Sequence, residues 1–109
     1  MSPKSGTAAA GGRPLQPLIH GRVRLLVLSR LVKSGPSTFL ELRAELGLTD
    51  GTLSVHLSRL AEGGVVELEK RFVGRKPQTV VKLTRGGRTR FKRYVRELRE
   101  IVPGVADDD

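Results

Sequence analysis

The sequence predicts a mainly α-helical fold with one small β-hairpin. In four segments, apolar residues recur at spacings of three and four, which is the period of one face of a helix. Between the third and fourth of these segments, apolar and polar residues alternate with period two on either side of a link that contains Gly and Pro. The expected order along the chain is therefore helix, helix, helix, hairpin and helix.

The first helix is expected to run from about Pro17 to Lys33 and to end at Ser34-Gly35-Pro36. Its apolar positions, Ile19 and Leu31 among them, form a face that is broader than one small core needs. Such a helix should make a second apolar contact, either inside its own domain or with another chain.

A short second helix is expected over residues 39–46, and Gly47 should end it. Thr49 is well placed to cap a third helix that runs from Asp50 to about Glu62. The third helix has a leucine-lined buried face, and two glycines at 63–64 terminate it. Two helices joined by so short a turn form a helix-turn-helix.

The hairpin is expected in the segments VVELEKRFV and QTVVKLT, with residues 74–77 as its loop. In the first strand, Val66, Leu68 and Phe72 share one parity, as alternation requires. The last helix is expected from about Arg85 to Val102, and Gly86-Gly87 should weaken its first turn.

This order is that of a winged helix-turn-helix, with a three-helix core, a two-stranded wing and a C-terminal helix for dimerisation. We expect residues 15–102 to form the DNA-binding domain with its terminal helix. Residues 1–14 are expected to be a flexible arm, and residues 103–109, which end in three aspartates, a flexible acidic tail.

The charge is strongly basic, with 20 Lys and Arg against 11 Asp and Glu. Such a net charge of +9 attracts polyanions, so nucleic acid or an anionic membrane surface is the expected partner class. The chain has no cysteine, which excludes disulfides, thiolate metal sites and a cysteine nucleophile. His20 and His56 alone make no metal site, and no catalytic motif is present. We therefore expect no cofactor and no enzymatic activity.

No apolar run is long enough to span a bilayer, and the N-terminal residues lack the apolar core of a signal peptide. A cytoplasmic location is the expectation that follows from the missing signal and the lack of disulfides.

The third helix is the candidate reading element. Its exposed side combines small and hydrogen-bonding groups, which suit entry into a major groove and contact with base edges. The alternative interpretation is an ordinary polar surface facing solvent. The residues on that side and its flanks are Gly51, Thr52, Ser54, Val55, His56, Ser58 and Arg59.

The hairpin loop is the second candidate element, because Arg75 and Lys76 lie at its tip and Arg71 on its stem. Cations on a two-stranded ribbon can contact phosphates or enter a minor groove. The alternative is a turn that only adds solubility, although Pro77 stiffens it.

The last helix carries a continuous apolar stripe, which we expect to pack on the first helix of a second subunit. The alternative is that the stripe packs back on its own domain. The predicted interface residues are Leu18, Leu25, Phe91, Tyr94, Val95, Leu98, Ile101 and Val102.

The segments LIHGRVRLLVLSRL and LGLTDGTLSVHLSRLAEGGVVELEKRFVGRKPQTVVKLTRGGR resemble the stand-alone winged-helix transcription regulators related to the MarR and ArsR groups. The resemblance covers roughly residues 15–102, and GLTDGTLSVHL and FVGRKPQT are its most specific parts. It implies a homodimer that binds double-stranded DNA, with the third helix, Thr49 included, in the major groove and the hairpin as wing. Metal sensing is not carried over, because the ligands of the ArsR sensors are missing, and an effector is left open.

Two other functions compete with this one. A winged helix can serve as a module for RNA or for a protein partner, and a basic amphipathic helix can lie on an anionic membrane. RNA binding through base stacking needs exposed aromatics. We expect all four aromatic residues to lie in the core or an interface: Phe39, Phe72, Phe91 and Tyr94.

Overall fold

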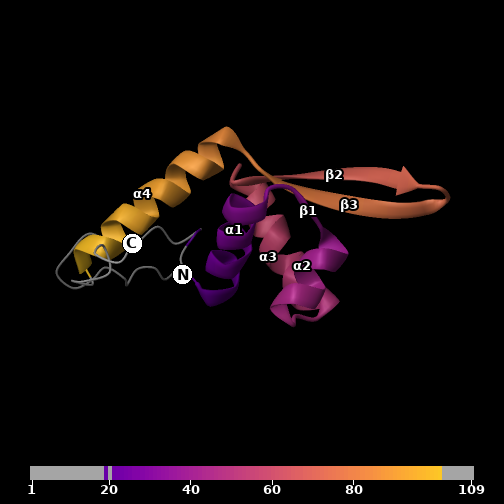
Figure 1. The fold of residues 1–109 in the computed structure, drawn as a ribbon, viewed down its shortest axis with the longest axis horizontal. Coiled ribbons are helices and arrows are strands. Elements are labelled where there is room, and N and C mark those ends of the chain that lie inside the picture. Colours follow the sequence, from indigo (N-terminus) through magenta and orange to yellow (C-terminus); the bar gives the residue numbers. More distant parts are fainter. Residues whose placement is uncertain (1–18, 20, 102–109) are drawn as a thin grey trace, which may run out of the picture.

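The computed structural model describes Ile19 and residues 21–101 and confirms the predicted fold class. The structure has four helices and a three-stranded antiparallel sheet. The first three helices form a helical body, from which the hairpin projects on one side and the last helix on the other (Figure 1). The elements are α1 Arg22–Ser34, β1 Ser37–Thr38, α2 Phe39–Leu46, α3 Asp50–Glu62, β2 Val66–Val73, β3 Lys76–Leu83 and α4 Arg85–Ile101.

The core lies between α1, α2, α3 and the base of the sheet, where leucines and valines of all these elements meet. Their burial follows from the helical periods, because each helix turns one apolar face inward. Fully or almost fully buried members are Ile19, Val27, Leu28, Leu31, Leu42, Leu53, Leu57, Leu60, Val65, Val66, Val81, Phe91 and Tyr94.

Helix α1 begins later than predicted. Gly21 precedes it with φ 128°, a backbone conformation that is absent from helices and that residues with a side chain rarely adopt. The helix therefore starts at Arg22 and not near Pro17. Ile19 still reaches the core and is fully buried. Pro17 itself and Leu18 lie outside the described residues.

The bounds predicted for α2 and α3 are confirmed, because side chains cap both helices. Thr49 Oγ1 accepts a hydrogen bond from the Thr52 backbone N–H at 3.1 Å, as the sequence predicts. Thr38 and Glu41 form a reciprocal capping box at the start of α2, which the sequence analysis did not identify.

A third strand completes the sheet, whose order is β1-β3-β2. The two-residue strand β1 pairs Ser37 with Val81 and Thr38 with Val80. Strand β3 therefore lies in the middle at its base, and both Val80 and Val81 are buried although they point to opposite faces. A strand of two residues has no readable period, so the sequence predicted only the hairpin.

The hairpin turn is shorter than predicted. Residues Lys76 and Pro77 belong to β3, so the turn consists of Gly74 and Arg75 alone. Gly74 has φ 64°, and a positive φ at a first turn position is the reason that two-residue hairpins favour glycine there.

The register places Val66, Leu68 and Phe72 on one face of β2, as predicted, but only Val66 is buried. Phe72 is 72% exposed, so of the two places expected for the aromatics, the core is wrong for this residue, and an interface stays a prediction. The helical body covers only the base of the hairpin, and the distal half extends beyond it (Figure 1).

Helix α4 starts at Arg85, as predicted, although two glycines lie in its first turn. Thr84 caps it, because the Gly87 N–H donates to Thr84 Oγ1 at 2.8 Å. Thr84 Oγ1 itself donates to the Gly64 carbonyl oxygen at 2.6 Å and lies 3.1 Å from the Val65 carbonyl oxygen. Gly87 is buried directly against that carbonyl: an added Cβ would lie 2.1 Å from the Val65 oxygen. The glycine thus permits close packing where the sequence indicated only a weak turn.

Candidate nucleic-acid interface

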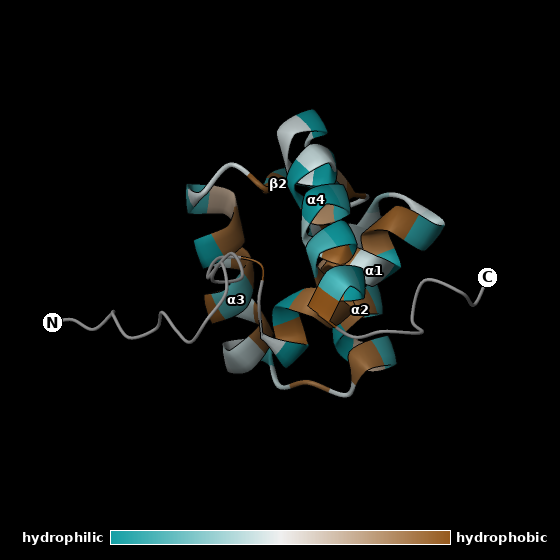
Figure 2. Ribbon diagram, turned by 90° about the vertical axis from the view of Figure 1, so that its left-hand side faces the viewer, coloured by the Kyte–Doolittle hydropathy of each residue, from teal (hydrophilic) through white to brown (hydrophobic). Residues whose placement is uncertain are grey.

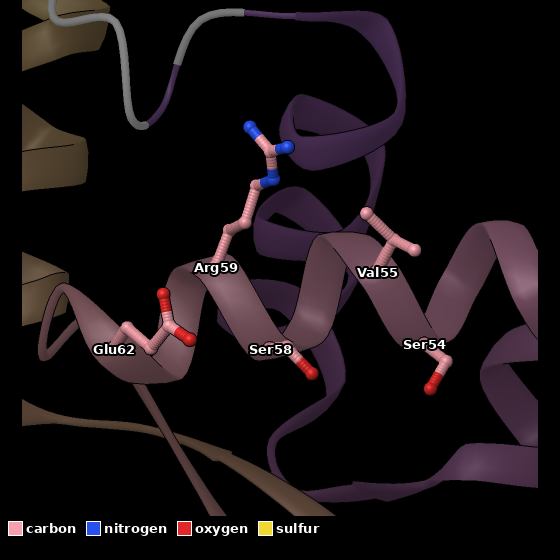
Figure 3. A pocket seen from close by; sticks show the side chains of 5 residues that line it. All are labelled: Ser54, Val55, Ser58, Arg59 and Glu62. Carbon is pink, nitrogen blue, oxygen red and sulfur yellow. The ribbon is translucent and has the colours of Figure 1, made fainter.

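Helix α3 presents a polar face whose position is fixed by its three buried leucines (Leu53, Leu57 and Leu60). Every predicted reading residue from Gly51 to Arg59 is exposed except His56, which is half-buried. Figure 3 shows that Val55 and Arg59 point to one side of the helix and Ser54 and Ser58 to the other. These four line a shallow hollow together with Glu62. Methyl, hydroxyl and guanidinium groups are thus brought together on one surface.

Glu62 is the member of this face that the sequence analysis missed. Its spacing of three from Arg59, four from Ser58 and seven from Val55 was the available signal, because those intervals share one helical face. The carboxylate adds negative charge at the C-terminal end of the face (Figure 3). A carboxylate there repels phosphate groups but can accept a hydrogen bond from the amino group of cytosine.

Hydroxyl groups mark the N-terminal end of α3. Thr49 Oγ1 donates to Thr52 Oγ1 at 3.0 Å in addition to capping the helix. The Thr52 hydroxyl therefore accepts one bond and keeps its own proton for another acceptor. The carboxylate of Asp50 pairs with Arg43 at 2.7 Å, which offsets its charge at this end of the helix.

His56 is held by a side chain of a different helix. Arg24 Nε of α1 donates to His56 Nδ1 at 3.2 Å, so the proton of the neutral imidazole lies on Nε2. Burial, and then the positive charges of Arg24 and Arg59, lower the pKa of His56 below its ordinary value. His56 is accordingly an uncharged group that offers one N–H donor.

The lowered pKa of His56 makes stability depend on pH. In the unfolded chain the imidazole takes up a proton near the ordinary pKa of 6.5, and in the folded chain only at lower pH. The contribution of the neutral imidazole to the stability of the fold is therefore complete above pH 6.5 and is lost as the pH falls. His56→Gln keeps an acceptor for Arg24 but does not titrate. We expect urea unfolding to show wild type losing stability relative to His56→Gln between pH 7 and pH 5. Parallel pH curves for the two proteins would contradict the assignment.

The basic residues of the wing are exposed to solvent. Arg71, Arg75 and Lys76 are all exposed, as their predicted role requires. Nearer the base, Lys82 pairs with Glu69 across the two strands at 2.7 Å, so this lysine is partly neutralised. Residues 70–79 contain four basic residues and no acidic one. The positive charge of the hairpin is therefore concentrated at its tip.

The apolar stripe of α4 divides into two parts. Phe91 and Tyr94 are buried against the chain's own core, and Val95 and Leu98 pack partly on it. Ile101, at the far end, is 57% exposed. Figure 2 shows hydrophilic residues between the hydrophobic ones along α4. Leu25 of α1 packs partly on the same core, whereas Leu18 and Val102 lie outside the described residues.

The wing and the free end of α4 lie at opposite ends of the molecule's longest axis (Figure 1). Helix α3 lies between them and joins β2 through a tight link, in which the Val65 N–H donates to the Leu60 carbonyl at 2.9 Å. The elements predicted to contact DNA and the predicted dimer interface thus lie on separate parts of the molecule.

Within the described part of the chain, no three His, Cys, Asp or Glu side chains gather in a group that could hold a metal ion. None of the helices there combines the length and hydropathy needed to cross a bilayer.

Comparison with known proteins gives a consistent result. Residues 23–102 match a family described as a winged helix DNA-binding domain. An uncharacterized protein of Methanocaldococcus jannaschii is 37% identical over 88 residues, which cover 81% of this chain and 96% of that protein.

Solved structures agree with this match. A transcriptional regulator homologue from Pyrococcus horikoshii OT3 has a TM-score of 0.75 and 30% identity, over 80% of this chain and 86% of that chain. Reduced AbfR bound to DNA has a TM-score of 0.66 and 26% identity, over 75% of this chain and 59% of that chain. The likeness thus extends over most of both chains in the first case and over little more than half of AbfR in the second.

Proposed function

The chain belongs to the winged helix DNA-binding domain family, and on this premise we propose that it is a homodimeric transcription regulator of the MarR- or ArsR-like kind that binds a specific double-stranded sequence. The observation that carries the proposal is the exposed face of α3, which is low in bulk, rich in hydrogen-bonding groups and fixed in place by buried leucines. A helix in the major groove needs such a face.

In this proposal α3 reads base edges. The hydroxyls of Thr52, Ser54 and Ser58 serve as donors or acceptors, Val55 offers methyl groups to thymine, and Arg59 suits the two acceptors of guanine. His56 contributes a single N–H donor from Nε2. Gly51 has no side chain, so the backbone there can approach the DNA closely, and Thr49 holds this end of the helix in place through its cap.

Arg71, Arg75 and Lys76 of the wing contact phosphates or a minor groove beside the major groove that α3 occupies. Their exposure on a projecting ribbon and the absence of acidic residues over 70–79 support this role.

Dimerisation is assigned to α4 and α1. Its support is the exposed Ile101 at the end of an otherwise partly buried apolar stripe. A shallow hollow between the two helices, lined by Val32, Phe91 and Val95 with cations around it, lies beside this stripe. A second subunit would cover these apolar groups, and the two α3 helices would then reach two half-sites.

The test combines association with footprinting on a duplex selected from a random pool. We expect the wild type to be a dimer that protects two half-sites about 10 base pairs apart, or a multiple of that spacing. Ile101→Asp should give a folded monomer, because a charge buried in an interface loses several kcal/mol of hydration. Leu40→Asp, at a site on α2 that is 59% exposed, is the matched control and should remain dimeric.

Light scattering and the footprint together decide the outcome. A dimeric Ile101→Asp protein would contradict the α4 interface, and equal retention of duplex DNA and structured RNA by the wild type would favour the RNA-binding alternative.

A further inference from the structure

Phe72 is the most exposed large hydrophobic residue in the described part of the chain, at 72%. The other three aromatic residues are at least half-buried. A single exposed apolar side chain is common on protein surfaces. Phe72 differs because of what surrounds it at the tip of the wing.

The strand register places Phe72 opposite Pro77, one residue pair before the last pair of the hairpin. Because paired residues share a face, the phenyl ring and the proline ring lie side by side on one face of the ribbon. The final pair, Val73 with Lys76, points to the opposite face. The tip is therefore apolar as well as charged, and the proline restricts its backbone.

The charge at the tip restricts what can cover the phenyl ring. Lys70, Arg71, Arg75 and Lys76 surround it in sequence, and no carboxylate lies between residues 70 and 79. The tip of a second copy would carry the same four cations and be repelled. A partner must present negative charge and apolar surface together, within the width of a two-stranded ribbon.

The minor groove of duplex DNA meets both requirements. Phosphates line its two edges, and several minor-groove proteins place apolar side chains between its base steps. We propose that Phe72 is a DNA-contact residue that packs into the minor groove, flanked by phosphates bound to the wing cations. The inference rests on the proposed function, and it adds an apolar, salt-independent contact to a wing otherwise described by its charge.

The test uses the full chain with Phe72→Ala and Phe72→Leu on the selected duplex. We expect Phe72→Ala to weaken binding about tenfold for each subunit, since burying a phenyl ring contributes about one decade of affinity or more. The slope of log affinity against log salt should not change, because no phosphate contact is lost. Phe72→Leu should keep most of the affinity, because it retains a large apolar side chain at the same position.

Hydroxyl-radical footprinting locates the contact, because the radicals attack deoxyribose from the minor groove. Phe72→Ala should lose protection at the sugars outside the central major-groove contacts, with an unchanged unfolding midpoint. Wild-type affinity and footprint in Phe72→Ala would overturn the inference while leaving the proposed function intact. A changed subunit association would assign the ring to a protein contact and also overturn it. A wild type that binds no duplex would refute both.

Discussion

Gly87→Ala is expected to destabilise the protein by about 3 kcal/mol, which is the upper part of the range for overpacked sites. An alanine Cβ would lie 2.1 Å from the Val65 carbonyl oxygen and 2.8 Å from its carbon. Both atoms belong to the backbone, so no side chain can rotate away to make room. The same carbonyl accepts a hydrogen bond from the Thr84 N–H at 3.0 Å, which also holds it in place. Urea unfolding measures the loss.

Gly86→Ala is the matched control, one residue away in the same turn of α4. A Cβ at Gly86 meets nothing within 4 Å, and the backbone there has no positive φ. Alanine should instead stabilise the helix by up to about 1 kcal/mol, because glycine is the poorer helix former. Similar unfolding free energies for the two variants would show that α4 does not pack on Val65 as described.

The helices could be predicted well where their ends depend on local sequence. Thr49 and Gly47 determine caps through neighbouring backbone groups, so α2 and α3 begin and end at the predicted residues. The start of α1 was misplaced because the positive φ of Gly21 is not encoded in an apolar period. Strand β1 was missed because two residues carry no pattern, and its pairing depends on a strand more than forty residues later.

The exposed surfaces needed the tertiary structure. Alternation placed Phe72 on the correct face of the hairpin, but only the size of the helical body decides how far that face is covered. The bond from Arg24 to His56 joins two helices that sequence spacing cannot relate. Gly87 was interpreted only as a helix-weakening residue. The contact that requires a glycine there is with a carbonyl twenty-two residues earlier, which sequence spacing does not indicate.

If the wing and α3 contact DNA as proposed, their different charges predict different effects of mutation. Arg75→Ala combined with Lys76→Ala should lower affinity for specific and random duplexes by similar factors, because phosphate contacts carry no sequence information. In a dimer the change removes two cations from each subunit. The slope of log affinity against log salt should flatten by up to about 3.6 if every cation meets a phosphate. A salt titration with both duplexes measures this effect.

Ser58→Ala is the counterpart on α3, at an exposed position where no charge is removed. It should weaken the preferred duplex selectively, by about 1–3 kcal/mol where a base contact is lost, and leave the salt slope nearly unchanged. The exposed face of α3 has Arg59 as its basic residue and Glu62 one turn away, so α3 adds little net charge to the proposed contact. If the wing variant kept the wild-type slope while Ser58→Ala weakened both duplexes equally, the reading and gripping roles would be assigned to the wrong elements. If a single Arg75→Ala change weakened the specific duplex more than the random one, that guanidinium would instead lie in a narrow minor groove. A·T-rich DNA has such a groove, and its shape attracts arginine.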